Sequence, residues 1–125
     1  MVPVLVIDHD KERLADTTAV LSRHGYCPLA ARFDSDALSL LDDMPIEVAL
    51  VEYQPARPEH AALIGSIRRH HPHVALIALT DDVFGRARAQ STLRALDVAA
   101  VVHRPFPPAA LINAVGHHLL DALAA

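Results

Sequence analysis

The chain has 125 residues, of which 52% are apolar and 21% charged, and its formal net charge is −4. This length fits one domain with one hydrophobic core, and a mean hydropathy of +0.24 excludes a disordered segment. No apolar run reaches the roughly 18 residues that cross a bilayer, and eleven Lys and Arg spread along the chain form no basic field for nucleic acid.

The amino terminus carries no export signal. Met1-Val2-Pro3 has no basic residue, and the apolar run that follows is too short for a signal-peptide core. Cys27 is the single cysteine, so no internal disulfide can form. We therefore expect a cytoplasmic protein that contacts neither membrane nor nucleic acid directly.

Short apolar runs alternate with stretches of helical periodicity along the chain. In chain order, the first half predicts a strand at 4–7, a helix from Asp10 to Gly25, a strand at 27–31, a helix from Asp34 or Ser35 to Pro45, and a strand at 48–51. The second half predicts a loop at 54–59, a helix at 61–71, a strand at 74–79, a helix from about 83 to 96, a strand at 98–102, and a helix from Pro107 or Pro108 to about 123. This βαβ alternation predicts a parallel sheet with helices on both faces.

Side chains that cap helices precede two of the predicted helices. Asp34 or Ser35 can cap the second helix, and Asp81 or Asp82 can cap the fourth. Acids at these positions also interact favourably with the positive end of the helix dipole.

Several motifs stand at the predicted strand ends. Asp8-His9-Asp10 follows the first strand, Ala78-Leu79-Thr80 ends the fourth, and His103-Arg104-Pro105-Phe106 follows the fifth. In order and spacing, these motifs resemble the receiver domain of two-component response regulators, over residues 3 to 122. The resemblance implies one receiver-like domain, residues 1–125, with a flavodoxin-like (CheY-like) fold: a doubly wound five-stranded parallel sheet in the order 2-1-3-4-5 and five helices.

The family's chemistry requires an aspartate that accepts a phosphoryl group, a magnesium ion held by acids, a hydroxyl and a lysine. Glu52 is the residue that matches the phosphoacceptor, although Pro55 stands one residue nearer than the family's proline. If that proline is aligned instead, Val51 takes the acceptor position. Neither register places an aspartate there, so the resemblance implies an altered site.

The acidic pocket of the family corresponds to Asp8, His9 and Asp10. His9 stands where typical members have a second acid that ligates magnesium, and imidazole is a poor ligand for this hard cation. We therefore expect no metal or cofactor, or at most weak Mg²⁺ binding at Asp8 and Glu52. In an alternative interpretation, Asp8 and Asp10 only cap the following helix.

The resemblance places the switch hydroxyl at Thr80 and replaces the lysine with Arg104, before the cis-proline candidate Pro105. A guanidinium suits a carboxylate, so a Glu52–Arg104 ion pair is expected. Val101 and Val102 occupy the region where the family carries a switch aromatic. Thr80 has an alternative role as a helix cap.

Nine histidines raise the question of a metal site, above all at 70–73 and in the His117-His118 pair. Adjacent helical residues point in different directions, and no set of four ligands has structural-zinc spacing. The sequence therefore favours solvated histidines over a zinc site.

These departures indicate an atypical receiver that acts in signal transduction by phosphorylation-independent protein contact, with Glu52 as a built-in phosphomimetic and no enzymatic activity. The implied partners are an output domain or partner protein, a histidine kinase, and a second copy bound through the fourth helix, fifth strand and fifth helix. Two alternatives stay open: a receiver phosphorylated by a histidine kinase, and a flavodoxin-like domain that binds a small ligand at the carboxyl ends of its strands.

Overall fold

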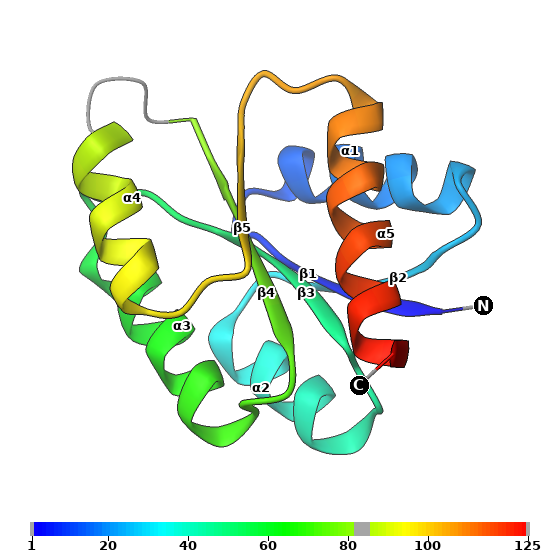
Figure 1. Ribbon diagram of the computed structural model, residues 1–125, viewed down its shortest axis with the longest axis horizontal. Helices are drawn as coiled ribbons and strands as arrows, with labels where there is room; N and C mark the ends of the chain where they lie inside the picture. Colours follow the sequence, from blue (N-terminus) through cyan, green and yellow to red (C-terminus); the bar gives the residue numbers. More distant parts are fainter. Residues whose placement is uncertain (1, 82–85, 125) are drawn as a thin grey trace.

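The computed structural model describes residues 2–81 and 86–124, and within them the chain forms a five-stranded sheet (Figure 1). The strands are β1 (Pro3–Ile7), β2 (Cys27–Ala31), β3 (Val48–Glu52), β4 (Ala75–Thr80) and β5 (Ala100–His103). Every neighbouring pair is parallel, and the order is β2-β1-β3-β4-β5. The predicted fold class is confirmed.

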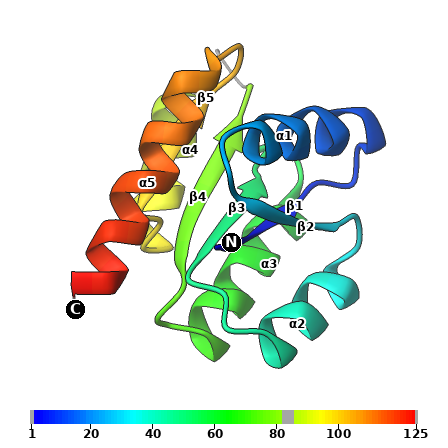
Figure 2. The same ribbon diagram turned by 90° about the vertical axis from the view of Figure 1, so that its right-hand side faces the viewer.

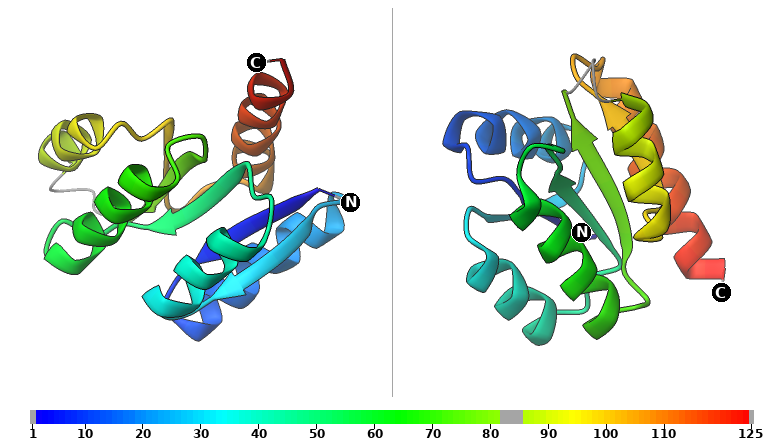
Figure 3. Two further views of the ribbon diagram at one scale, coloured as in Figure 1. Left: turned by 90° about the horizontal axis from the view of Figure 1, so that it is seen from below. Right: turned by 90° about the vertical axis from the view of Figure 1, so that its left-hand side faces the viewer.

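Helices cover both faces of the sheet, as the side views show (Figures 2 and 3). They are α1 (Lys11–Arg23), α2 (Asp34–Asp43), α3 (Pro58–His70), α4 (Arg86–Ala95) and α5 (Pro108–Ala124). The buried side chains form two clusters, one under α1 and α5 and the other under α2, α3 and α4. No helix within the described residues is both long enough and apolar enough to cross a membrane.

The central strands are buried on both faces because their apolar runs are continuous. In β1, Leu5 and Ile7 belong to the α2–α3–α4 cluster, whereas Val4 and Val6 belong to the α1–α5 cluster. The parallel register places Ile7 beside Val51 of β3. Asp8 follows Ile7 and Glu52 follows Val51, so the register brings both acids to the same edge of the sheet.

Two predicted helix starts differ from the structure, and two strands are offset: β4 spans Ala75–Thr80 rather than 74–79, and β5 spans Ala100–His103 rather than 98–102. α2 begins at Asp34 with Phe33 as its N-cap and no side-chain cap, so the predicted cap at Asp34 or Ser35 is wrong and Asp34 lies in the first turn. α3 begins at Pro58 rather than residue 61, because proline suits a first helical position. The predicted cap Asp82 and the predicted start of the fourth helix near 83 lie outside the described residues.

The end of α1 depends on a glycine. His24 is the C-cap, and Gly25 follows at φ +86°, in the left-handed region. The amide of Tyr26 donates to the carbonyl of Leu21, so the turn closes over the last carbonyls of the helix. This turn leads the chain directly into β2.

Replacing Gly25 with alanine should destabilise the fold by about 1 kcal/mol, because a Cβ at positive φ is strained. No heavy atom lies within 4 Å of the new Cβ, so the cost is conformational. Gly116→Ala is the matched control, since its Cβ would lie 3.6 Å from Tyr26 Oη in ordinary contact. Urea unfolding should show the first variant less stable than the second, and equal midpoints would contradict this account.

Candidate functional site

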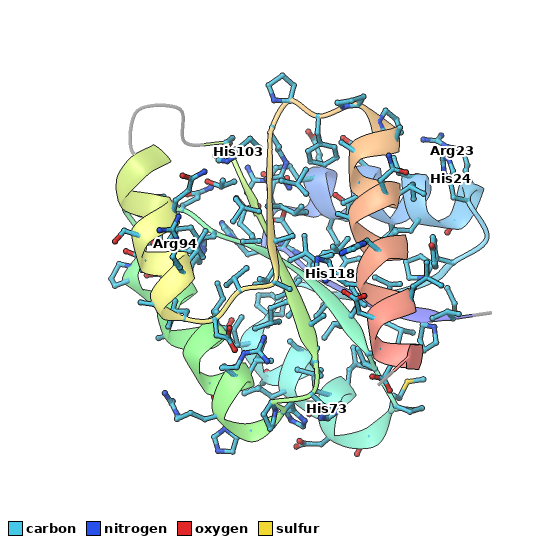
Figure 4. The ribbon with its side chains drawn as sticks, in the orientation of Figure 1. Arg23, His24, His73, Arg94, His103 and His118 are labelled. Carbon is cyan, nitrogen blue, oxygen red and sulfur yellow. The ribbon has the colours of Figure 1, made fainter. Side chains whose placement is uncertain are left out.

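The candidate site lies at the carboxyl edge of the sheet, where parallel α/β sheets place their sites. Asp8 follows β1, Glu52 ends β3, Thr80 ends β4, and Arg104 follows β5. His103, at the end of β5, marks this edge in Figure 4, with His73 at the opposite edge. The structure thus brings together the residues that the sequence analysis drew from four separate segments.

Asp8 and Glu52 are both buried, each with 3% of its surface exposed. Their charges meet two guanidinium groups. Arg13 lies with Nε 3.2 Å from Asp8 Oδ2 and also 3.2 Å from Glu52 Oε2. Arg104 lies with Nη1 3.4 Å from Glu52 Oε2 and Nη2 3.5 Å from Asp8 Oδ2. We call Asp8, Glu52, Arg13 and Arg104 the four-charge cluster.

Arg13 is the member of the four-charge cluster that the sequence analysis missed. It projects from the first turn of α1 and holds Asp8 with two groups, since Nη2 also donates to Oδ1 at 3.3 Å. A cation near a helix N-terminus is unfavourable with the helix dipole unless it has an anionic partner. An arginine in the first turn of a helix that follows an acidic strand end therefore indicates an ion pair with those acids, and this pattern could have identified Arg13 from the sequence.

Backbone and amide donors complete the shell around the two carboxylates. The amide of Asp10 donates to Asp8 Oδ1 at 2.8 Å, and the side-chain amide of Gln54 donates to Glu52 Oε1 at 3.0 Å. Asp10 itself caps α1 by accepting from the amide of Arg13 at 3.0 Å. Asp10 thus has the capping role of the alternative interpretation, whereas Asp8 does not act as the cap.

The pKa values of Asp8 and Glu52 are shifted in opposite directions. Burial, together with the adjacent Asp8, raises the pKa of Glu52 to about 7, although Arg104 and Gln54 oppose the shift. Burial would also raise the pKa of Asp8, but the hydrogen bond with Glu52 and the guanidinium of Arg13 outweigh it and lower that pKa. Asp8 therefore keeps its charge, and Glu52 is the member of the pair that takes up a proton.

A small cavity adjoins the pair on the side of α3. Its lining includes Asp8, His9, Glu52 and His60, and its volume is about 30 Å³. The rings of His9 and His60 lie 5.6 Å apart, and His60 Nδ1 accepts from the amide of Gln54 at 3.0 Å. A cavity of this size holds about one water molecule, so it has no room for an organic ligand.

The switch-equivalent residues, Thr80 and Arg104, come from the ends of β4 and β5, the two strands that follow β3 in the sheet. Thr80 is fully buried, and its carbonyl accepts from the amide of Arg104 at 2.8 Å. The Arg104–Pro105 peptide bond is cis. The guanidinium of Arg104 lies 5.9 Å from the ring centre of Phe106. These contacts fix the backbone from which Arg104 reaches the carboxylates.

Comparison with solved structures identifies proteins that share this fold. No protein-family model matches the chain, and no curated protein matches it. Among solved structures, it resembles a CheY-like response regulator receiver domain protein from Methanospirillum hungatei JF-1, with 18% identity, a TM-score of 0.86 and coverage of 99% of this chain and 98% of the other. A signal receiver domain of an HD domain-containing protein from Pseudomonas fluorescens Pf-5 matches with 19% identity, a TM-score of 0.84 and coverage of 99% and 98%.

A larger protein contains the same fold as one part. NtrX from Brucella abortus matches with 20% identity and a TM-score of 0.86, over 99% of this chain but only 28% of that one. Similarity at this level of identity establishes the fold. The chain therefore has the fold of response regulator receiver domains.

Glu52→Gln should change how stability depends on pH. The raised pKa means that between about 4.5 and about 7 the folded state keeps a proton that the unfolded chain releases, so the free energy of unfolding falls as pH rises. Above that range the loss is complete. Urea unfolding from about pH 5 to about pH 7 should therefore show the wild-type stability falling relative to that of the variant.

Comparing the wild type with the Glu52→Gln variant cancels the effect of histidine titration on stability, because both proteins carry the same histidines. Glu59→Gln serves as the matched control, since Glu59 is exposed and its partner is the exposed Arg57. Its stability curve should run parallel to that of the wild type over this range. If the Glu52→Gln curve is also parallel, the raised pKa of Glu52 is refuted.

Proposed function

We propose that this chain is a receiver-type signalling domain that acts by binding a protein partner without being phosphorylated. The observation that carries the proposal is the four-charge cluster. Arg13 and Arg104 satisfy Asp8 and Glu52 where the family would place a metal ion and a phosphoryl group. An intramolecular salt-bridge network thus takes the place of a phosphorylation site.

The residues present do not fit a magnesium ion. Mg²⁺ prefers octahedral coordination by oxygen, and it is held through one or two carboxylates together with water and phosphate. Here the guanidinium of Arg13 contacts both Asp8 and Glu52, so a divalent cation at these oxygens would adjoin a positive charge. His9 supplies nitrogen where the family supplies a further carboxylate.

The carboxylate of Glu52 is also a poor nucleophile in this setting. Oε1 accepts from Gln54, and Oε2 lies against Arg13 and Arg104. Only 3% of the residue is exposed, so a phosphodonor has little access to either oxygen. Phosphoryl transfer needs a nucleophile that the phosphodonor can reach, and groups that stabilise the negative charge that develops on the transferred group and the leaving group.

Glu52 acts as a built-in phosphomimetic in this proposal. Its ion pair with Arg104 joins the end of β3 to the chain after β5 at 3.4 Å. A phosphoryl group on the acceptor would be neutralised by the family's lysine at the same place. The ionised carboxylate makes this contact without any phosphoryl group, so the domain would hold its active-like arrangement without a kinase whenever Glu52 is charged.

The proposed contact surface is the α4–β5–α5 face. A groove of about 340 Å³ lies between the end of α4 and β5, and its lining includes Leu93, Arg94 and Val101. β5 is the edge strand of the sheet, and Leu120 on α5 is 69% exposed. A groove of mixed polar and apolar lining, with the exposed Arg94 on it, fits a protein partner or a second copy of this chain.

The phosphorylation state can be tested by intact mass after incubation with magnesium and acetyl phosphate. The wild type should gain no phosphoryl group. The double variant His9→Asp, Glu52→Asp restores two acids but keeps Arg13, so it should react poorly. Adding Arg13→Ala frees the carboxylates, and this triple variant should gain a phosphoryl group.

A phosphoryl adduct on the wild type would contradict the proposal and support the phosphorylated receiver instead. Circular dichroism of each variant guards against misfolding. A folded triple variant that reacts no better than the double variant would show that Arg13 is not what blocks the site.

Self-association should depend on the α4–β5–α5 face. Arg94 and Arg23 lie on opposite sides of the molecule in Figure 4, and both are exposed. Sedimentation at high protein concentration should show a dimer for the wild type and a monomer for Arg94→Glu, because the new charge faces the groove. Arg23→Glu makes the same charge change elsewhere and should leave the dimer intact. A wild type that stays monomeric would count against a homodimer.

A further inference from the structure

The outer surface of α5 carries a group of potential metal ligands that the function proposed above does not use. His117, His118 and Asp121 lie near the carboxyl end of this helix, and His118 is labelled in Figure 4. Their ligand atoms all lie within 4.8 Å of one another, the only group of three or more His, Cys, Asp or Glu found so close among the described residues. All three residues belong to one helix, and none of them belongs to the four-charge cluster.

The spacing explains how one helix brings the three side chains together. His117 and Asp121 are four residues apart and therefore share a face, and His118 is three residues from Asp121. The two imidazole rings meet edge to face with their centres 5.0 Å apart. The expectation that adjacent histidines point apart does not hold here, because both rings turn toward Asp121 between them.

The distances suit metal coordination better than hydrogen bonding. His117 Nε2 lies 3.5 Å from Asp121 Oδ2, and His118 Nδ1 lies 4.0 Å from the same oxygen. Both separations are long for a hydrogen bond. Two ligand atoms on one tetrahedral zinc ion, with bonds of about 2.0–2.2 Å, stand about 3.4 Å apart. Small rotations of the two exposed side chains, His117 and Asp121, would close the difference, whereas His118 is only 17% exposed.

The donor set identifies the class of metal. Two imidazole nitrogens and one carboxylate oxygen favour borderline ions such as Zn²⁺, Ni²⁺ and Cu²⁺, whereas Mg²⁺ and Ca²⁺ prefer oxygen ligands alone. Three protein ligands leave one position of a tetrahedral ion for water, as in zinc sites that are not purely structural.

We propose that His117, His118 and Asp121 form a surface site for a divalent transition-metal ion of the zinc class. The ion would contact all three side chains, which lie within about one turn of α5. His117 and Asp121 are 70% and 66% exposed, so the site is open to ions from solution. The same exposure means that substitutions there leave the hydrophobic core intact.

Isothermal titration of the untagged full chain with ZnCl₂ tests this site. The wild type should bind one ion per chain at this site. His117→Ala and Asp121→Asn should each weaken that binding by about tenfold or more, because each removes a ligand. Zinc should also raise the melting temperature of the wild type more than that of either variant, since it binds only the folded helix.

A second group of histidines provides the control. His73 is exposed, its ring lies 6.3 Å from that of His71, and His71 Nε2 lies 3.0 Å from Asp42 Oδ1. His73→Ala should leave zinc binding unchanged if α5 holds the ion. The proposal is overturned if the wild type binds no zinc, if His117→Ala and Asp121→Asn bind as the wild type does, or if His73→Ala loses the binding.

Discussion

The structure depends on how it accommodates two carboxylates buried side by side. The parallel register of β1 and β3 pairs Ile7 with Val51, and strands lie about 4.8 Å apart, so Asp8 and Glu52 must be neighbours at the sheet edge. Two like charges in a buried position are costly unless cations neutralise them. Arg13 and Arg104 supply those cations from two sides, which ties α1 and the chain after β5 to the central strands.

Such a network is weak evidence for stability but strong evidence for a fixed arrangement. Apolar replacements of a buried ion pair are often as stable, whereas loss of one partner costs about 3–5 kcal/mol. The pKa of Glu52, raised to about 7, moderates that cost, because the carboxyl can take up a proton and donate to its neighbour instead of remaining a second anion. The four-charge cluster thus connects the ends of β1 and β3 to the start of α1, and the strength of these contacts depends on whether Glu52 carries a proton.

The sequence predicts the sheet well because its strands are continuous apolar runs, and these leave little freedom in order or direction once helices alternate with them. It also predicts the Glu52–Arg104 ion pair, which is present at 3.4 Å, because both residues match motifs at strand ends. Arg13 was missed because it belongs to no motif and joins the site through a side chain five residues beyond Asp8. The sequence analysis considered the His117-His118 pair and favoured solvated histidines, but it left out Asp121, whose closeness to both rings depends on rotamers as well as on spacing.

In the function proposed above, the difference between a metal ion and an arginine is what would let this fold act without phosphorylation. A metal ion exchanges with solvent, so a site built on it can be loaded and emptied. The guanidinium of Arg13 is attached to α1 and stays charged at any physiological pH, so it cannot exchange with solvent as a metal ion does. The electrostatic state of the site can then change through a proton on Glu52, or through a partner that draws Arg13 or Arg104 away from the carboxylates. In the proposed function, control by partner binding therefore follows from the covalent attachment of the cation to the chain.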